Sequence, residues 1–252
     1  MISKNKIKFL RSLGIKKYRD KNNKSILEGV RLINESINHN AQIDGIWICE
    51  TYKNLNNQII SKNNSKQLID YIKKEDFKLL SNTKHSQGII AEVNTHQNDL
   101  FKFSKPLNEN IIIIDSISDP GNLGTIFRTC AWFGIKTVIL STNTTDAFNP
   151  KCLRSGMGSH FYFNNILKGD NNNIIDLLSN SNFNVLCADL EGDNIGNLNI
   201  EDKPWALILG SEANGISDDF SRYNKITIPK KGSLESLNVS VACGIILHQL
   251  FK

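Results

Sequence analysis

The segment NLGTIFR (residues 122–128) follows a run of four isoleucines and opens an apolar helical pattern. Two comparable segments lie further along the chain, LGSEANGIS (residues 209–217) and IPKKGSLESLNVS (residues 228–240). Each follows a predicted buried strand, and each combines glycine with small polar side chains. Ligand sites in α/β folds lie at the carboxyl ends of strands, where glycine lets a ligand approach the backbone. We therefore expect the three segments to meet in one binding site.

Strand and helix patterns alternate around these segments through the second half of the chain. Such alternation predicts a mostly parallel sheet that is covered by helices on both faces. The predicted strands are residues 111–115, 137–140, 161–163, 184–188, 205–209 and 225–228, and the predicted helices are residues 121–133, a helix near Lys151, 174–178 and 239–251.

The first half of the chain predicts a smaller α/β domain. Ser25 and Glu28 have the spacing of a capping box and place a helix over residues 25–37. A further helix is predicted at 66–73, with strands at 43–49, 77–80 and 88–93. Residues 97–106 lack clear periodicity. We therefore predict a domain at residues 1–97, a linker at 98–106 and a second domain at 107–252.

The overall charge of +5 conceals an asymmetry between the two halves. Residues 1–105 carry 19 Lys and Arg against 10 Asp and Glu, whereas residues 106–252 carry 11 against 15. The first 24 residues alone hold nine basic side chains and a single acid, Asp20. A solvated basic helix accounts for such a pattern, but positive charge concentrated on one domain is also typical of a nucleic-acid binder.

The composition argues against a metal site, a disulfide framework and a membrane anchor. The cysteines are odd in number, scattered and never in a C-x-x-C pair; they are Cys49, Cys130, Cys152, Cys187 and Cys243. No apolar run approaches the roughly 20 residues that a membrane helix needs. Residues 1–13 are basic but lack the apolar core of a signal peptide. We expect a cytoplasmic protein without a metal ion.

Arg128 is the side chain of the first segment that is hardest to explain by packing. It lies on an otherwise apolar predicted helix, where a guanidinium needs an anionic partner because unpaired buried charge is very costly. That partner is either a carboxylate of the protein or a phosphate of a ligand. Asn122 has a simpler alternative role as the N-cap of the same helix.

Two common nucleotide sites are disfavoured by the glycine spacing. The second segment lacks the G-x-x-x-x-G-K-[ST] pattern and its lysine, which argues against a triphosphate site. No G-x-G-x-x-G follows a strand, because Gly156-Met157-Gly158 lacks the third glycine. In the third segment Asn238 is placed to cap the last helix. The Gly/Ser-rich backbone of this third segment is equally suited to hydrogen-bond the edge of an adenine.

Taken together, the motifs N-x-G-x-I-x-R, L-G-S-E-x-x-G-I-S and I-P-x-x-G-x-x-E-S-L-N-V-S-V-A resemble those of the SpoU (TrmH-like) RNA 2′-O-ribose methyltransferases of the SPOUT class. They occur in that family's order. Residues 16–19, 27–33 and 86–91 (KKYR, LEGVRLI and SQGIIA) resemble the small RNA-binding domain, related to a ribosomal-protein fold, that precedes many members. The resemblance covers nearly the whole chain. One departure is Ala213, where a glycine is common.

The resemblance implies a small amino-terminal α/β RNA-binding domain and a carboxyl-terminal, mostly parallel sheet domain with a trefoil knot. Periodicity alone would argue against a knot, because knots are rare. The resemblance also implies S-adenosylmethionine as the cofactor, RNA as the substrate and a homodimer.

Carried over by position, the family's site residues fall into three groups in this chain. The expected catalytic residues are Asn122, Arg128, Glu212, Ser236 and Asn238. The expected cofactor contacts are Leu209, Gly210, Gly215, Ile228, Leu237 and Asn238. RNA contacts are expected from basic residues of the first domain, namely Lys16, Lys17, Arg19 and Arg31. No metal ligand is expected.

The implied reaction requires a ribose 2′-hydroxyl to attack a sulfonium methyl group, and this hydroxyl is a very weak acid. A base, or a stabiliser of the incipient alkoxide, is therefore required. A guanidinium stays protonated below about pH 12, so we expect Arg128 to hold a phosphate or the developing oxyanion. We expect Asn122 and Asn238 to orient the ribose or the loop.

We predict an RNA 2′-O-methyltransferase whose substrate is ribosomal RNA, with tRNA as the alternative. Two rival hypotheses are a non-catalytic RNA-binding assembly factor and a methyltransferase for small molecules. The second does not account for the basic first domain.

Overall fold

The computed structural model describes residues 2–55, 69–81, 83, 85–199 and 203–252. The chain forms two compact units. Unit 1 contains residues 1–96 and 146–161, and unit 2 contains residues 97–145 and 162–252. The division of labour between an RNA-binding domain and a methyltransferase domain stays a prediction.

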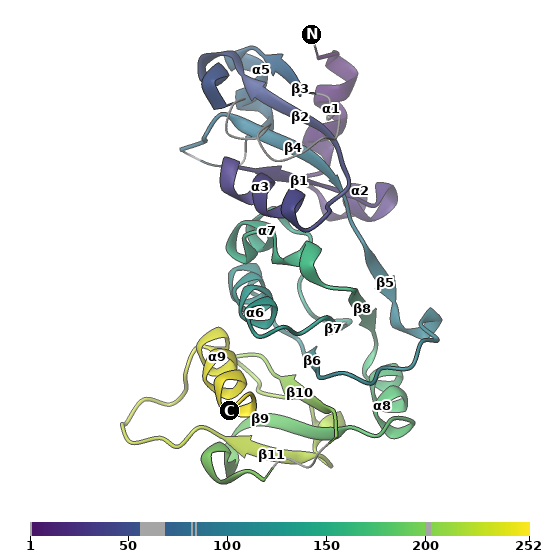
Figure 1. Cartoon of the computed structure of the whole chain (residues 1–252), viewed down its shortest axis with the longest axis vertical. Helices are drawn as coiled ribbons and strands as arrows, with labels where there is room; N and C mark the ends of the chain where they lie inside the picture. The colour runs from purple at the N-terminus through teal and green to yellow at the C-terminus, as the bar shows by residue number, and fades with distance from the viewer. Residues whose placement is uncertain (1, 56–68, 82, 84, 200–202) are drawn as a thin grey trace. The chain divides into compact units, whose positions relative to one another are not determined.

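Unit 1 is built on a four-stranded mixed sheet of order β1-β4-β2-β3 (Figure 1). Strand β4 pairs antiparallel with both β1 and β2, and β3 pairs parallel with β2. The elements are α1 (Lys4–Ser12), α2 (Lys16–Asn22), β1 (Lys24–Glu28), α3 (Val30–Asn38), β2 (Ile43–Cys49), η1 (Glu50–Leu55), β3 (Ile69–Ile72), α5 (Lys74–Leu80), β4 (Ile89–Asn94) and α7 (Pro150–Gly156), while η3 (Ser159–Tyr162) crosses the boundary at residue 161.

Unit 2 is built on a seven-stranded sheet in which every pairing between neighbouring strands is parallel. The strand order is β11-β9-β10-β6-β7-β8-β5. The elements are β5 (Gln97–Asp99), η2 (Leu100–Lys102), β6 (Ile111–Ile114), α6 (Pro120–Trp132), β7 (Thr137–Ser141), β8 (Asn165–Gly169), α8 (Asn171–Ser179), β9 (Asn184–Asn194), η4 (Ile195–Asn197), β10 (Trp205–Leu209), η5 (Asp218–Phe220), β11 (Asn224–Thr227) and α9 (Val239–Leu250).

The continuous isoleucine run of β6 is explained by its position at the centre of this sheet. Ile111 and Ile113 belong to a core cluster that includes Ile174 and Leu178 of α8. Ile112 and Ile114 point to the opposite face, because side chains alternate along a strand, and they are equally buried. A strand buried on both faces has no polar side and therefore carries no alternation in sequence.

The strand order of unit 2 reverses between β6 and β10. From β6 the chain builds outward through β7 and β8, and it then returns to the other side to form β9, β10 and β11. In open parallel sheets, ligands bind outside the carboxyl ends of the strands at such a reversal. The first two sequence motifs follow β6 and β10, and both are therefore placed at this point.

Several predicted elements of unit 1 were wrong. The predicted helix at 25–37 begins later, because residues 24–28 pair with β4 as strand β1. Ser25 is not a cap, since its hydroxyl donates to the backbone oxygen of Phe148 at 2.9 Å. The predicted strand at 77–80 lies in helix α5, and residues 69–72 of the predicted helix at 66–73 form strand β3. Residues 66–68 lie outside the described residues.

Unit 2 follows the predicted pattern more closely. Strands 111–115, 137–140, 184–188, 205–209 and 225–228 and the helices at 121–133, 174–178 and 239–251 have counterparts there, while the helix predicted near Lys151 is α7 of unit 1. The exception is the predicted strand at 161–163, which is replaced by η3 and followed by β8. Strand β5 had no predicted counterpart.

Of the two helix N-caps considered in the motif segments, the structure confirms Asn238 but not Asn122. Asn238 caps α9 as predicted, because its side chain accepts from the backbone N–H of Ser240. The cap of α6 is Asp119 and not Asn122, since Asp119 Oδ1 accepts from the backbone N–H of Asn122 at 2.9 Å. The Asn122 side chain is therefore available for other contacts.

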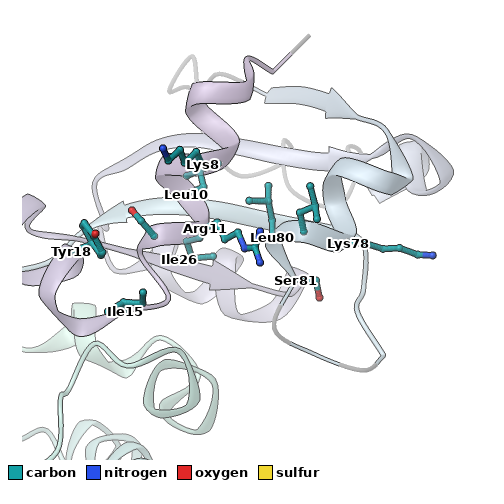
Figure 2. A pocket seen from close by; sticks show the side chains of 11 residues that line it. Lys8, Leu10, Arg11, Ile15, Tyr18, Ile26, Lys78, Leu80 and Ser81 are labelled. Atoms are coloured by element: carbon teal, nitrogen blue, oxygen red, sulfur yellow. The ribbon is translucent and has the colours of Figure 1, made fainter.

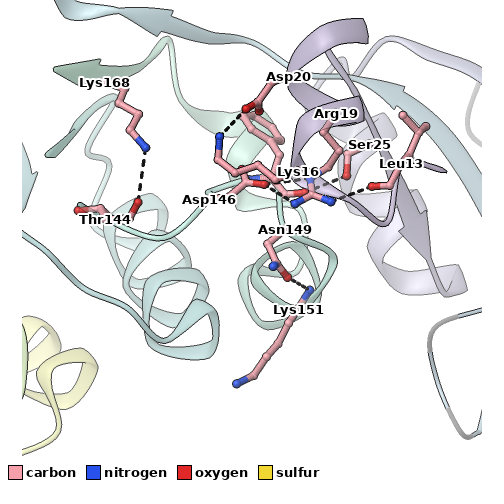
Figure 3. Close-up of polar contacts among 11 residues, drawn as sticks. Leu13, Lys16, Arg19, Asp20, Ser25, Thr144, Asp146, Asn149, Lys151 and Lys168 are labelled. Carbon is pink, nitrogen blue, oxygen red and sulfur yellow. Dashed lines mark hydrogen bonds and ion pairs between the residues drawn. The ribbon is translucent and has the colours of Figure 1, made fainter. Parts of the chain in front are cut away.

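Arg19 is held inside unit 1 by an ion pair with Asp146 (Figure 3). Its Nη2 and Nε lie 2.5 and 2.9 Å from Asp146 Oδ2, and its Nη1 donates to the Leu13 carbonyl oxygen at 2.8 Å. The side chain is only 4% exposed. We had expected Arg19 to contact RNA, whereas its side chain is buried and fastens residues 146–161 to α2.

The described part of the chain contains no helix that is long and apolar enough to cross a membrane. All five cysteines are buried as free thiols.

Asp146→Asn should destabilise unit 1 by about 3 kcal/mol, because a buried guanidinium loses its charged partner. Chemical denaturation measures this change. Asp20→Asn is the matched control, since it breaks the exposed pair with Lys16 and should cost less than about 1 kcal/mol. Equal stability of the two variants would show that Arg19 does not depend on Asp146.

Candidate functional site

A cavity of about 650 Å³ opens in unit 2 at the carboxyl ends of β10 and β11, beside residues 188–190 of β9 and against α9. Many of the residues predicted from the motifs line it together, namely Leu209, Gly210, Glu212, Gly215, Ile228, Ser236 and Leu237. Asn238 lies between two lining residues, Leu237 and Val239. The second and third segments therefore meet in one cavity, as expected.

The loop that follows β10 forms one wall of this cavity. Ser211 and Gly215 exchange two backbone hydrogen bonds of 2.9 Å, which close residues 211–215 into a tight turn. Gly215 adopts a left-handed φ of 68°. A Cβ on Gly210 would lie 2.3 Å from the carbonyl carbon and oxygen of Gly215. Glycine is thus required at position 210 by the loop itself, and not only by an approaching ligand.

Asp115 anchors this loop to the end of β6, a role that the sequence analysis missed. Its carboxylate accepts from the backbone N–H of Ser217 at 2.7 Å and from the Ser217 hydroxyl. Ser116 donates to its other oxygen at 3.0 Å. Asp115 is fully buried. A carboxylate directly after four isoleucines was the available signal, because a buried acid needs several donors.

Asn122, Glu212 and Asn238 form a chain of side-chain hydrogen bonds across the three segments. The Asn122 amide nitrogen donates to Glu212 Oε1, and its amide oxygen accepts from Asn238 Nδ2 at 3.0 Å. Asn238 Oδ1 accepts from the backbone N–H and the hydroxyl of Ser240, at 2.9 and 2.6 Å. Both ends of the Asn122 amide are therefore fixed. Three of the five predicted catalytic residues therefore come together here.

Arg128 lies two turns along α6 from Asn122 and does not join this chain. From the sequence we expected Arg128 to be buried in an apolar helix and to need an anionic partner. The side chain is instead exposed, and within the described residues no hydrogen bond or ion pair engages it. A structural ion pair therefore does not explain Arg128, and its guanidinium is presented to solvent.

The loop between β11 and α9 contributes residues 228–232 and 234–237 to the cavity lining and is exposed along residues 230–238. Figure 1 shows this loop extending away from the sheet. Ser236 and Leu237 belong to it, and Leu237 is 46% exposed although it is apolar. An exposed leucine at the rim of a cavity provides apolar surface that a ligand would bury.

One charged side chain of the cavity wall has a fixed ionisation state. Asp189 accepts from Lys225 Nζ at 2.9 Å. Burial of the Asp189 carboxyl works to raise its pKa, but the hydrogen bonds and charge of Lys225 outweigh it and hold the pKa below its usual value. Asp189 is therefore an ionised hydrogen-bond acceptor in the wall at neutral pH.

The cavity suits an adenosine-containing cofactor. Its volume is in the range typical of cofactor sites. Leu209, Ile228 and Ile246 offer apolar surface for a flat ring, and the backbone of residues 210–215 and 228–232 offers donors and acceptors for a base edge. No His, Cys, Asp and Glu cluster that could hold a metal ion occurs among the described residues.

The predicted RNA-binding residues are divided between the surface and the interior of unit 1. Lys17 and Arg31 are exposed, and Lys16 is exposed but pairs with Asp20. Arg19 is buried in the ion pair with Asp146. The surface of unit 1 therefore presents three of these four cations.

Two family models match the chain. The SpoU rRNA Methylase family matches residues 109–248, and the MRM3-like substrate binding domain matches residues 4–91. A Borreliella burgdorferi protein described as an uncharacterized tRNA/rRNA methyltransferase is 33% identical over 74% of this chain and 84% of its own length. The Bacillus subtilis 23S rRNA (guanosine(2553)-2′-O)-methyltransferase RlmP is 29% identical over 97% of this chain and 95% of its own length.

Solved structures agree over the whole chain. A TrmH-family protein from Porphyromonas gingivalis superposes with a TM-score of 0.84 at 28% identity, over 99% of this chain and 98% of that one. The AdoMet-bound rRNA methyltransferase from Sinorhizobium meliloti gives 0.83 at 24% identity, over 99% and 95%. The predicted SPOUT fold, with the trefoil knot that this class carries, is confirmed. The chain belongs to the SpoU rRNA Methylase family and is a methylase of that family, as its three motifs predicted.

Proposed function

We propose that the protein transfers a methyl group from S-adenosylmethionine to a ribose 2′-hydroxyl of structured RNA. The observation that carries this proposal is the convergence of the second and third segments on one cavity, with Asn122 of the first segment hydrogen-bonded to Glu212 and Asn238 beside it. Bound S-adenosylmethionine supplies an electrophilic methyl group. The residues of this chain bind, orient and stabilise the groups around it.

The fixed amide of Asn122 defines where a polar group of the substrate can be held. Glu212 and Asn238 occupy its nitrogen and oxygen, so the side chain cannot rotate freely. A preorganised site of this kind costs little reorganisation when charge develops during reaction. Asn122 and Asn238 thus orient the loop and the ribose, and Ser236 supplies a hydroxyl from the cavity wall.

Arg128 is assigned to charge stabilisation. Its exposure leaves all five guanidinium donors available to an RNA phosphate or to the developing oxyanion. Chemistry disfavours a literal base, because a guanidinium stays protonated at any useful pH.

Ribosomal RNA is the proposed substrate and tRNA the alternative. The Bacillus subtilis relative that spans nearly the whole chain is named for 23S rRNA, and the first domain matches a substrate-binding model. A non-catalytic assembly factor is disfavoured by the intact chain of Asn122, Glu212 and Asn238. The proposed location is the cytoplasm, where bacterial ribosomes are assembled.

Deletion of the gene should remove one 2′-O-methyl group from ribosomal RNA. Mass spectrometry of nuclease digests from the deletion strain and its parent tests this expectation, and plasmid-borne wild type should restore the group. Loss from tRNA alone would support the alternative substrate. Unchanged methylation of both RNAs would contradict the proposed activity.

S-adenosylhomocysteine should bind the cavity. At 100 times its Kd, linkage should raise the free energy of unfolding by about 2.7 kcal/mol, and the melting temperature should rise with it. Ala242→Leu adds bulk to the cavity wall on α9 and should weaken binding at least about tenfold, because the lining must give way. Isothermal titration measures the affinity.

Gly244→Ala is the matched control for this variant. Gly244 lies on the same helix, does not line the cavity, and a Cβ there meets only Thr129 Cγ2 at 3.9 Å. Its affinity should equal that of the wild type. Tight binding by the Ala242→Leu protein would place the cofactor elsewhere.

Arg128→Lys should lower turnover about 100-fold or more while the melting temperature and cofactor affinity stay nearly unchanged. Lysine keeps the charge but loses the planar fork, and an exposed arginine contributes little to folding. Arg222→Lys, which alters another exposed arginine, controls for general effects.

Raising the pH separates the two roles of Arg128. If it stabilises charge, hydroxide should not rescue the Arg128→Ala protein. Rescue at high pH would instead indicate a general base, and full activity of either variant would remove Arg128 from the site.

The homodimer is proposed to form through α6 and α9. These helices pack against each other, and Gly244 of α9 lies against Thr129 of α6. Next to this contact the helices expose Trp132, Val241 and Ile245, with Trp132 86% exposed. Large exposed apolar side chains beside a helix–helix contact are typical of an interface. A second copy fits best, since Arg128 lies one turn from Trp132 and would join the same interface.

Trp132→Glu should convert the dimer to a monomer, because the interface would bury an unpaired carboxylate. Light scattering after size-exclusion chromatography measures the mass. Phe101→Glu is the control, since Phe101 is 79% exposed on η2. An unchanged dimer in the Trp132 variant would contradict this interface.

A further inference from the structure

Unit 1 contains a second cavity, of about 630 Å³, that none of the predicted site residues line (Figure 2). Helices α1 and α5 pack against each other and supply most of its lining, and residues at the start of α2 complete it. Leu10, Ile26 and Leu80 are buried and belong to the hydrophobic core of unit 1. The core thus forms the apolar base of an open pocket.

The charge around this cavity is entirely positive. Lys8, Arg11 and Lys78 line it, and no lining residue is acidic. Within the described residues no hydrogen bond or ion pair engages these three side chains, and all three are exposed. The carboxylate of Glu28 is occupied by Ser81 and Thr83, at 2.5 and 2.7 Å, and does not line the cavity. Three unpaired cations around one pocket attract an anion.

Large apolar side chains are also exposed around the cavity. Ile15, Tyr18 and Leu79 are 58%, 40% and 51% exposed. In the view of Figure 2, Tyr18 lies at one side of the lining and Lys78 at the other, with Arg11 between them. An occupant of this pocket therefore meets a flat aromatic ring and cationic groups at the same time.

A single unpaired nucleotide satisfies all of these features. Its base can stack on an aromatic side chain, and its phosphates can contact Arg and Lys. A free phosphate would leave the apolar side chains uncovered. A continuous duplex presents stacked bases that Tyr18 cannot reach.

We propose that this cavity binds an unpaired nucleotide of the substrate RNA, with the base against Tyr18 and the flanking phosphates on Lys8, Arg11 and Lys78. The proposal rests on the proposed function, since it deepens how that RNA is recognised. Unit 1 then selects RNA that carries a bulge, loop or single strand near the modified ribose.

The test measures binding by the full-length protein to two labelled RNAs, a short single strand of mixed sequence and a fully paired duplex. Tyr18→Ala should weaken binding to the single strand about tenfold, because one stacking contact is lost. Its affinity for the duplex and for S-adenosylhomocysteine should not change. Tyr71→Ala is the matched control, because Tyr71 is 36% exposed in the same unit and lies outside the cavity.

A second pair of variants tests the charges. Lys78→Gln should weaken binding to the single strand and reduce the slope of log affinity against log salt by about one. Lys74→Gln, one turn away on α5 and outside the cavity, should leave both unchanged.

The outcomes separate this proposal from the proposed function. If the wild type methylates RNA but Tyr18→Ala and Lys78→Gln behave like their controls, the cavity does not bind a nucleotide, although the enzyme assignment stands. Equal losses on single strand and duplex would also overturn it, since they indicate a general phosphate surface. If the wild type neither binds nor methylates RNA, the proposed function itself fails.

Discussion

The buried carboxylate of Asp115 is the contact on which the site of unit 2 depends. It ends the central strand β6 and accepts hydrogen bonds from Ser217 and Ser116. Through Ser217 it fixes the loop after β10 beside the helix that carries Asn122. The hydrogen bond from Asn122 to Glu212 requires this arrangement. A buried carboxylate without these donors would be very costly, so the loop and the strand end stabilise each other.

The sequence predicted unit 2 better than unit 1 for a physical reason. Strands such as 111–114 and 205–209 are apolar on both faces and are bounded by glycine and polar turns, so their pattern is decisive. In unit 1, the segments 24–28 and 77–80 are too short for their apolar pattern to distinguish a strand from a helix. Contacts with the rest of the unit decide between the two. The acidic first turn of α5, Glu75 and Asp76, was the local signal that favoured a helix there.

The sequence predicted those parts of the candidate site in which the type of residue alone indicates its role. Glycine at 210, asparagine at 122 and 238 and the apolar wall follow from the motifs. The exposure of Arg128 and the burial of Arg19 did not, because a sequence does not show which side of a helix meets solvent or which distant carboxylate, here Asp146, reaches a guanidinium. The unpaired cations of unit 1 become visible as a group only when α1 and α5 are seen together.

The central claim is that unit 2 methylates a ribose hydroxyl and not a base. The most direct measurement incubates the purified protein, radiolabelled S-adenosylmethionine and unmodified ribosomal RNA, and then hydrolyses the product with alkali. A 2′-O-methyl group blocks cleavage of the adjacent phosphodiester, so the account predicts that the label is recovered in alkali-resistant dinucleotides. Label recovered in mononucleotides would mean base methylation and would contradict the account.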